Sequence, residues 1–377
     1  MNYLDAIVLA GLDIIDGERT QSSIYHLLKG KKTSQTIQDA QLFGLSPLFQ
    51  MYRTLKRPYY DHRIQQCKEK GLIREIEPLK FRLTSTGRTA LDAYFSDRSF
   101  PVFLNGWKYH QITDVFWKRL TLTIQTGSNL IYSNHRFIPV TRDAEVQQWV
   151  KHTIRQHRDH LGDFTLKLHD ELKNLLENSE LPESPELLVG QFSGYNHIGL
   201  TNSQLAELFN CGTDELNTRF MNVLHFLFQE IESHPEQFPL LTNMMKTDEK
   251  SAIPFTKSTE ESYQYLKNRL SIDQIAAVRR LKRSTIEDHV LEIALLDPRF
   301  SIDPFIDHSL SERIRTLHIK SSRLKFIKDQ IPEADYFQIR LVLAKAERGE
   351  HVWKNYLKKN LDMIHSEAVK KKSSKPY

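Results

Sequence analysis

The 377-residue sequence is poor in the residues that build disulfide frameworks, zinc sites and tight turns. Its two cysteines, Cys67 and Cys211, lie far apart and outside any Cys-x-x-Cys pair. A disulfide framework or a zinc finger is therefore not expected. The chain has 14 glycines, whereas average usage of about 7% would give about 26. Because a glycine costs a helix about 1 kcal/mol, this scarcity favours a mainly helical fold.

The sequence also lacks signals for secretion or membrane insertion. No uninterrupted apolar run approaches the roughly 20 residues that a helix needs to cross a bilayer. Residues 1–15 contain Asp5 and Asp13 but no basic segment, and their apolar residues recur at helical spacing. This pattern indicates an amphipathic helix and not a signal peptide. We therefore expect a cytoplasmic protein that does not act at a membrane.

Enzyme motifs are missing as well. Residues 30–33, Gly-Lys-Lys-Thr, resemble the end of a phosphate-binding loop, but Tyr25 occupies the place of the required first glycine. His157 and His160 share one side of an expected helix, yet no carboxylate or cysteine pattern completes a metal site. Ser193 lacks the flanking glycines of a nucleophile elbow. We predict a protein that is not an enzyme, with no catalytic residues, no metal and no cofactor.

Charge alone does not decide the function. The chain carries 52 Lys and Arg against 47 Asp and Glu, a formal net charge of +5. This weak excess permits nucleic-acid binding without demanding it, so the local distribution of charge must decide. The 40% hydrophobic content supports well-packed cores. The length suits two or three domains.

The expected fold is mainly α and built from several modules. Residues 1–100 form a winged-helix-like domain with a small β-hairpin, and residues 101–245 form a helical middle domain. Residues 246–259 are a polar linker, residues 260–365 a helix-turn-helix domain of helicase type, and residues 366–377 a basic tail. In the middle domain, Asp143 is expected to cap a long helix reaching Leu175, with an interruption at Gly162 as the alternative. A capping box at residues 201–204 opens a second helix-turn-helix succession.

The N-terminal domain is predicted from the order of its elements. Several helices precede Lys70-Gly71-Leu72-Ile73, where glycine allows the left-handed conformation that ends a helix. A strand through Ile76, a turn at residues 77–79 and a strand with Phe81 and Leu83 then form a hairpin. A further helix follows residues 84–87. This order resembles bacterial winged-helix domains.

The helix before this hairpin is expected to start at Arg57-Pro58. Basic side chains surround it, namely Arg53, Lys56, Arg57, His62 and Arg63, and others lie on the hairpin. A basic helix and wing is the usual footprint of duplex backbone contact, whereas a solvated face is the equally ordinary alternative. The candidate DNA-contacting residues of this domain are Arg57, Arg63, Arg74, Lys80 and Arg82.

The C-terminal helix-turn-helix is the clearest motif in the chain. Ser271 to Gln274 is a capping box that opens one helix, and Ser284 to Glu287 reads as a second capping box that opens the next. Between them, Arg279, Arg280, Lys282 and Arg283 place four cations in a five-residue turn. Such a cluster at a helix amino end suits phosphate contacts, whereas a solvated corner of the surface is the ordinary alternative.

Residues 271–289 read S-I-D-Q-I-A-A-V-R-R-L-K-R-S-T-I-E-D-H. This stretch is similar to the helix-turn-helix at the C-termini of many RecQ-family DNA helicases, in which I-A-x-x-R-G-L precedes S-T-I-x-x-H-L. The matching residues are Ile275, Ala276, Arg279, Leu281, Ser284, Thr285, Ile286 and His289. Arg280 stands where glycine is usual, and Val290 where leucine is usual. The similarity covers roughly residues 260–344.

No helicase motor accompanies this module, and the whole chain resembles the free-standing bacterial YpbB family. The resemblance implies a helicase-associated module encoded apart from a RecQ-type helicase and often beside it. It also adds Ser284, Thr285 and His289 to the candidate DNA-contacting residues, although packing is the commoner role for such a histidine.

The helix after the turn argues against reading of base sequence. It carries Glu287, Asp288 and Glu292 and no lysine or arginine, so in a groove it would meet phosphates with carboxylates. We therefore expect recognition of the DNA backbone or structure without reading of sequence, or a helix that faces protein. The first hypothesis is therefore a DNA-binding accessory protein that acts with a RecQ-family helicase in repair or recombination, through backbone contacts to duplex or junction DNA. A helix-turn-helix transcription regulator and an interaction scaffold without DNA binding are the alternatives.

Overall fold

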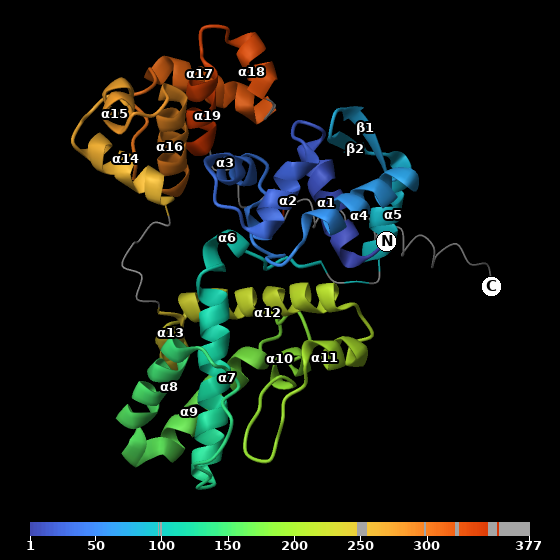
Figure 1. Ribbon diagram of the computed structural model, residues 1–377, viewed down its shortest axis with the longest axis vertical. Helices are drawn as coiled ribbons and strands as arrows, with labels where there is room; N and C mark the ends of the chain where they lie inside the picture. Colours follow the sequence, from blue (N-terminus) through green and yellow to red (C-terminus); the bar gives the residue numbers. More distant parts are fainter. Residues whose placement is uncertain are drawn as a thin grey trace, which may run out of the picture. The chain divides into compact units, whose positions relative to one another are not determined.

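The computed structural model describes residues 1–96, 98, 100–246, 255–297, 299–320, 324–345 and 353 (Figure 1). These residues form helices and a single two-stranded sheet, which confirms the mainly α prediction. Most of the predicted linker and the whole basic tail at residues 366–377 lie outside the described residues. The chain divides into two compact units, of which one is Met1–Leu4 with Arg98–Asp248 and the other is Asp5–Asp97 with Glu249–Tyr377.

The first part of the second unit has the predicted order of helices, hairpin and helix. Its elements are α1 (Tyr3–Ile15), α2 (Gln21–Lys29), α3 (Ser34–Leu42), the 3-10 turn η1 (Ser46–Leu48), α4 (Arg57–Glu69), β1 (Ile73–Glu77), β2 (Lys80–Leu83) and α5 (Ser85–Phe95). Gly71, with φ of 66°, follows α4 and turns the chain into the hairpin, as predicted. The strands pair antiparallel with Ile73 opposite Leu83. Gly87 lets α5 approach the hairpin, because a Cβ there would lie 2.0 Å from the Leu72 carbonyl oxygen.

The second part of this unit is a bundle built around α16. Its elements are α14 (Lys257–Lys267), α15 (Ile272–Arg279), α16 (Arg283–Leu296), α17 (His308–Lys320), α18 (Leu324–Gln330) and α19 (Tyr336–Lys345). Helix α16 packs against α14, α15 and α19. Its apolar residues Ile286, Val290 and Ile293 are fully buried. The helix that a helix-turn-helix protein normally exposes is thus the central helix of this bundle.

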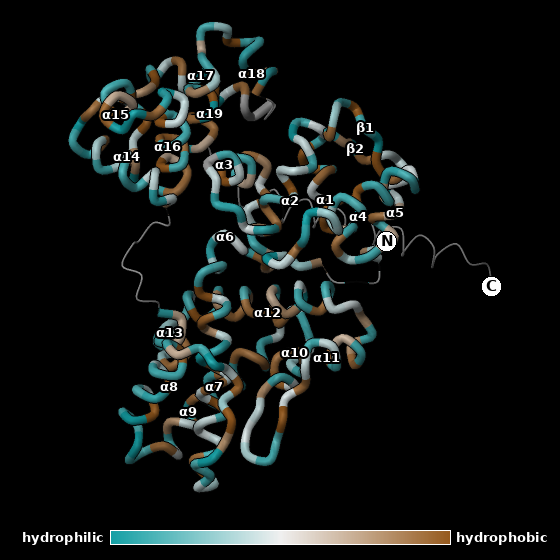
Figure 2. The backbone as a smooth tube through the Cα atoms, in the orientation of Figure 1, coloured by the Kyte–Doolittle hydropathy of each residue, from teal (hydrophilic) through white to brown (hydrophobic). Residues whose placement is uncertain are grey.

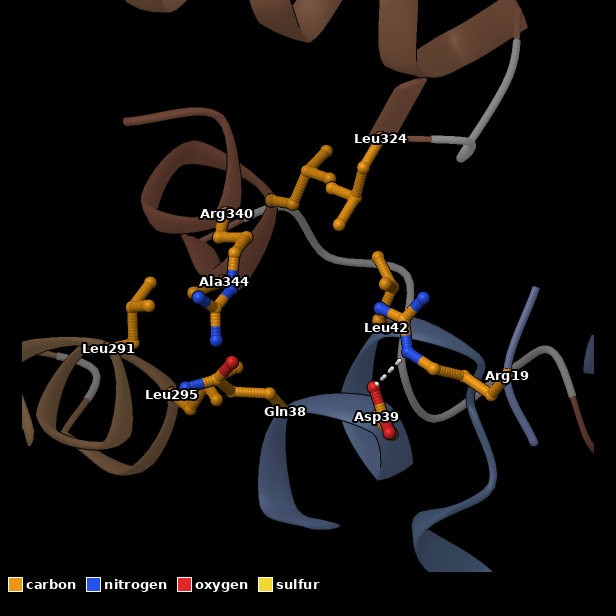
Figure 3. A pocket seen from close by; sticks show the side chains of 10 residues that line it. Arg19, Gln38, Asp39, Leu42, Leu291, Leu295, Leu324, Arg340 and Ala344 are labelled. Carbon is orange, nitrogen blue, oxygen red and sulfur yellow. Dashed lines mark hydrogen bonds and ion pairs between the residues drawn. The ribbon is translucent and has the colours of Figure 1, made fainter. Parts of the chain in front are cut away.

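The two parts of this unit pack together through α3, which contacts both α16 and α19. Leu42 of α3 joins the apolar core of the C-terminal bundle. Gln38 donates a hydrogen bond of 3.4 Å from Nε2 to Asp288 on α16. A small cavity of about 30 Å³ remains between these helices, and Figure 3 shows Gln38, Leu42, Leu291 and Arg340 around it. No local pattern predicts this contact, because it joins residues 250 positions apart.

The other unit is entirely helical. Its elements are α6 (Gly106–Tyr109), α7 (Ile112–Ile131), α8 (Ala144–Gln156), the 3-10 turn η2 (Arg158–His160), α9 (Leu161–Leu176), α10 (Glu186–Val189), α11 (Asn202–Leu208), α12 (Thr213–Ser233) and α13 (Pro239–Met245). The α7 and α12 helices supply much of its core, including Phe116, Leu120, Phe226 and Phe228. A groove of about 680 Å³ lies between α7, α9 and α10.

In this unit the two predicted helix starts are confirmed, whereas the predicted length of one helix is not. Asp143 caps α8 by accepting a hydrogen bond of 3.3 Å from the Val146 amide, and the capping box at Thr201 and Gln204 opens α11. The expected helix between Asp143 and Leu175 is interrupted, but before Gly162. The helix stops at Gln156, where the His157 ring nitrogen lies 2.8 Å from the Thr153 carbonyl oxygen and competes for the helical hydrogen bond. A 3-10 turn then leads into α9.

A membrane-spanning helix would have to be long and apolar, and the described part of the chain has no such helix. Figure 2 shows hydrophilic residues recurring along each of the long helices.

Candidate nucleic-acid interface

The turn between α15 and α16 begins as the sequence predicts and ends differently. The Ser271 hydroxyl oxygen accepts a hydrogen bond from the Gln274 backbone amide, and the Gln274 side-chain oxygen accepts one from the Ser271 backbone amide, so the first capping box is confirmed. Arg280 follows α15 with φ of 53°, the left-handed conformation. This is the position where the similar helicase modules carry glycine. The arginine therefore keeps the turn at a conformational cost of roughly 1 kcal/mol.

The second predicted capping box, at Ser284, is wrong. Helix α16 already begins at Arg283, so Lys282 is the N-cap and Ser284 lies within the first turn. Lysine offers no oxygen to accept from the backbone, and no side chain caps this end. Ser284 is exposed and Thr285 is half-buried. The amino end of a 14-residue helix is consequently free of a side-chain acceptor and carries the positive end of the helix dipole.

Two of the four cations in the turn are neutralised by neighbouring carboxylates. Arg279 is only 11% exposed at its side chain and pairs with Glu261 at 2.6 Å. It also donates to the Ser262 hydroxyl and the Ser258 carbonyl. Arg283 pairs with Asp273 and with Glu287, and these hydrogen bonds raise the pKa of its guanidinium. Arg279 is thus a structural residue, while Arg283 lies in the turn with its charge balanced.

The other two cations remain available. Arg280 and Lys282 are exposed, and within the described residues neither forms an ion pair or a side-chain hydrogen bond. They flank the open amino end of α16, where backbone amides and the dipole also favour an anion. This arrangement suits contact with a DNA phosphate.

The remainder of α16 is turned inward. His289 is buried and lies 2.8 Å from the Ser262 hydroxyl, and burial, followed by the nearby Arg279 charge, lowers its pKa. Glu292 is fully buried and accepts hydrogen bonds from Thr256 and Thr259. Glu292 therefore faces protein and not solvent, because it caps the start of α14.

Asp288, another acidic residue of α16, accepts from Arg340 at 3.1 Å and from Gln38. The side of α16 near Asp288 is thereby occupied by α19 and α3. Helix α16 cannot lie in a DNA groove in this arrangement, so only its amino end is accessible.

In the N-terminal part, Arg63 points toward the core. Its Nε donates 2.7 Å to one Asp5 oxygen and its Nη2 donates to the other, and Asp5 is 2% exposed. This ion pair joins α4 to α1 and removes Arg63 from the surface that DNA could reach.

Three further candidates are exposed or half-exposed but paired. Arg57 forms an ion pair of 2.8 Å with Asp61 and donates to Ser22, Lys80 pairs with Glu77 at 2.7 Å, and Arg82 pairs with Asp16 at 2.9 Å. Such surface pairs leave little net charge for a phosphate. Arg74 alone among the predicted residues of this domain is exposed without an ion pair in the described structure.

Further cations, which are not among the candidate DNA-contacting residues, lie around α4. Arg53, Lys56 and Lys70 are exposed, and within the described structure none of them forms an ion pair. Lys56 is the N-cap of α4 and Lys70 its C-cap. The helix boundaries could have identified both positions, because the sequence already placed the start of the helix at Arg57 and its end before Gly71.

Among the residues that the structure describes, no group of three or more His, Cys, Asp or Glu side chains is placed to hold a metal ion.

Comparison with known proteins agrees with the C-terminal architecture. The family described as "Helix-turn-helix domain" matches residues 258–343, and a domain of this kind suggests DNA binding. The chain is 32% identical over 349 residues to Protein YpbB of Bacillus subtilis (strain 168), an alignment that covers 92% of this chain and 98% of that protein. No solved structure matches the chain.

Proposed function

The chain belongs to the YpbB family, and on that premise we propose that it is a non-enzymatic DNA-binding accessory protein that works with a RecQ-type helicase in repair or recombination. The helicase supplies ATP-driven unwinding, and this protein holds duplex or junction DNA. The observation that carries the proposal is the exposed pair Arg280 and Lys282 at the uncapped amino end of α16.

This geometry favours contacts with the DNA backbone. Cations and free amides at a helix end hold phosphates and fix orientation without reading sequence. The body of α16 is covered by α3 and α19, so the helix-turn-helix offers no base-reading face. A sequence-specific regulator that reads DNA through α16 is accordingly disfavoured.

The helicase partnership rests on the similarity of residues 271–289 to the RecQ-family module. That similarity extends to residues whose role is structural. Ile275 and Ile286 are fully buried, Leu281 packs on the same core, and Arg279 and His289 both contact Ser262. The shared pattern therefore includes the packing of the module as well as its surface.

DNA binding is tested by fluorescence anisotropy of the full chain with duplex, fork and single-stranded DNA between about 50 and 200 mM salt. Affinity should fall with salt, and the double variant Arg280→Gln/Lys282→Gln should lessen the slope by about 0.9 for each lost phosphate contact. The matched control is Lys151→Gln/Arg155→Gln, which removes two exposed cations of α8. Equal slopes for the two double variants would contradict the assignment of the turn.

The partnership is tested separately by co-purification with the RecQ-type helicase of the same organism and by the rate at which that helicase unwinds a fork. Addition of this protein should increase the unwinding rate, and Arg280→Gln/Lys282→Gln should weaken the increase while leaving co-purification intact. A helicase that neither binds nor responds would remove this part of the proposal.

A scaffold that binds proteins and not DNA is the second candidate function. The observation in its favour is that α3 covers the helix which such domains usually present, so the helix-turn-helix serves here as a packing unit. Co-purification without DNA affinity at any salt concentration would select this candidate.

A further inference from the structure

The all-helical unit contains a groove that the proposed function does not use. It has a volume of about 680 Å³ and lies between α7, α9 and α10. Helices α7 and α9 contact each other and stand side by side in Figure 1. All three helices contribute apolar side chains to the walls, among them Ile124, Leu168, Leu172 and Val189. Both the volume and the apolar lining are typical of a binding site.

The shape of the groove suits a helix. The residues of α9 that line it run from Thr165 to Glu177 at intervals of three and four. At a rise of 1.5 Å per residue they extend over about 18 Å, the length of roughly twelve residues of a second helix. Ile131, Tyr132 and Val189 line the groove and are nevertheless exposed. An open apolar surface of this length can receive an amphipathic helix that inserts side chains at i, i+4 and i+7.

One hydroxyl at this groove lacks a hydrogen-bond partner. Threonines within helices commonly bond to the carbonyl four residues earlier, and Thr165 donates to Leu161 in this way at 3.0 Å. The Ser128 hydroxyl accepts from the Tyr195 amide at 3.0 Å. Thr123 also lines the groove and is fully buried, but its hydroxyl has no partner within the described residues. Because an unpaired buried hydroxyl costs stability, this group is well placed to bond to an inserted side chain.

The edge of the groove on α9 carries opposite charges on successive turns. His169, Lys173 and Glu177 line the groove at intervals of four residues, and all three are exposed. The nearest oxygen of Glu177 lies 3.8 Å from the Lys173 ammonium, which makes a loose surface pair. Such pairs contribute little to stability, so both charges can be matched by opposite charges on a partner.

We infer that this groove binds an amphipathic α-helix of a partner protein. Apolar side chains of that helix pack against Leu168 and Leu172, and a polar atom of one inserted side chain bonds to the Thr123 hydroxyl. The partner helix presents an acidic residue to Lys173 and a basic residue to Glu177. The inference goes beyond the proposed function, because it requires no DNA. It assigns recognition of a protein to the unit that contains residues 98–248.

The experiment uses the full chain and a displayed library of 14-residue peptides. The library fixes apolar residues at i, i+4, i+7 and i+11 and varies the other positions. Peptides are selected on the unaltered chain, and those that also bind Ile131→Glu are removed. Ile131 is 51% exposed, so the fold should tolerate this change. Selection should enrich peptides that carry an acidic residue beside the apolar face.

Fluorescence anisotropy of one selected peptide then tests the contacts. Ile131→Glu should weaken binding about tenfold or more, because it places a charge against the apolar face. Thr123→Val should weaken binding about fivefold through the loss of one hydrogen bond. Leu208→Glu is the matched control, because Leu208 is also an exposed apolar residue but lies on α11 outside the lining of the groove. This variant should bind the peptide as the unaltered chain does.

An exchange of charges tests the orientation of the helix. Lys173→Glu/Glu177→Lys keeps an ion pair at i and i+4 on α9, so the helix itself should be unaffected. It should weaken binding of the selected peptide about threefold. A peptide with its two matching charges exchanged should regain the affinity.

Several results would overturn the inference. They are a selection that enriches no peptide, and a selected peptide that binds the unaltered chain and Ile131→Glu equally well. If sedimentation shows a dimer of the unaltered chain that Ile131→Glu dissociates, the occupant is a second copy. If removal of residues 354–377 raises the affinity for the peptide, the occupant is that segment of the chain. Ile131→Glu should bind DNA as the unaltered chain does, so these results are distinct from a failure of the proposed function.

Discussion

Arg63 and Asp5 form a two-pronged ion pair between α4 and α1, with Nε of the arginine 2.7 Å from the Asp5 Oδ1 atom. The carboxylate is 2% exposed, whereas the arginine side chain is 18% exposed. The pair therefore holds α4 against α1. It stabilises the fold, and it also removes Arg63 from the surface that DNA could reach.

The first prediction is that Arg63→Met destabilises the protein by about 3–5 kcal/mol, because it leaves the Asp5 charge buried without a partner. Urea unfolding followed by circular dichroism measures the change. Arg88→Met is the matched control, since Arg88 pairs with Asp13 but its side chain is 60% exposed; its cost should stay below about 1 kcal/mol. If the two variants lose a similar free energy of unfolding, burial does not determine how much the Arg63 ion pair contributes to stability.

Arg280→Gly should stabilise the protein by about 1 kcal/mol, because glycine adopts the left-handed conformation at that position without steric cost. The same change removes one of the two unpaired cations of the turn and should weaken DNA binding. Thermal unfolding and the salt dependence of DNA affinity are to be measured on the same preparation. A variant that is less stable than the original chain would contradict the assignment of strain to Arg280.

Two threonines on α7 offer a test of buried hydroxyls. Thr123 is fully buried, and in the described structure its hydroxyl has no hydrogen-bond partner. Thr113 is also buried, but its hydroxyl donates 2.7 Å to the Tyr109 carbonyl. Thr123→Val should be neutral or stabilising by up to about 1 kcal/mol, and Thr113→Val should destabilise by about 1 kcal/mol. Denaturant midpoints of the two variants should therefore move in different directions, and a common shift would contradict this explanation.

Acid should weaken the unit that contains His225. This side chain is fully buried, its Nδ1 accepts the Asn105 amide at 3.0 Å, and burial lowers its pKa to about 3. Below the ordinary histidine pKa of about 6.5, His225 is protonated in the unfolded chain but stays neutral in the folded chain. Stability is thus complete above pH 6.5 and falls by about 1.4 kcal/mol per pH unit below it.

Denaturant unfolding between pH 7.5 and 5.5 by tryptophan fluorescence measures this dependence, since Trp107, Trp117 and Trp149 all lie in that unit. His225→Gln retains an acceptor for the Asn105 amide but cannot be protonated, so its stability should depend less on pH. Parallel profiles for the variant and the original chain would exclude His225 as the source.

Local patterns were sufficient to predict the elements that carry their own signals. Gly71 marks the end of α4, the alternation around Phe81 marks the hairpin, and Ser271 with Gln274 marks the start of α15. The predictions made from charge were less informative, because counting cations along the chain says nothing of their partners. Asp5 lies 58 residues from Arg63, and Glu261 lies 18 residues from Arg279. Only the tertiary fold determines which of the predicted cations stay available to a phosphate.

The contact between α3 and α16 has a consequence for biosynthesis. The unit that contains these helices is assembled from residues 5–97 and the stretch beyond residue 249, while residues 98–248 form the other unit between them. During translation the intervening unit can fold as soon as it leaves the ribosome. The N-terminal segment must wait for α16 and α19 before Leu42 is covered. Nascent chains halted before residue 283 should accordingly expose this leucine to chaperones, and the complete chain should not.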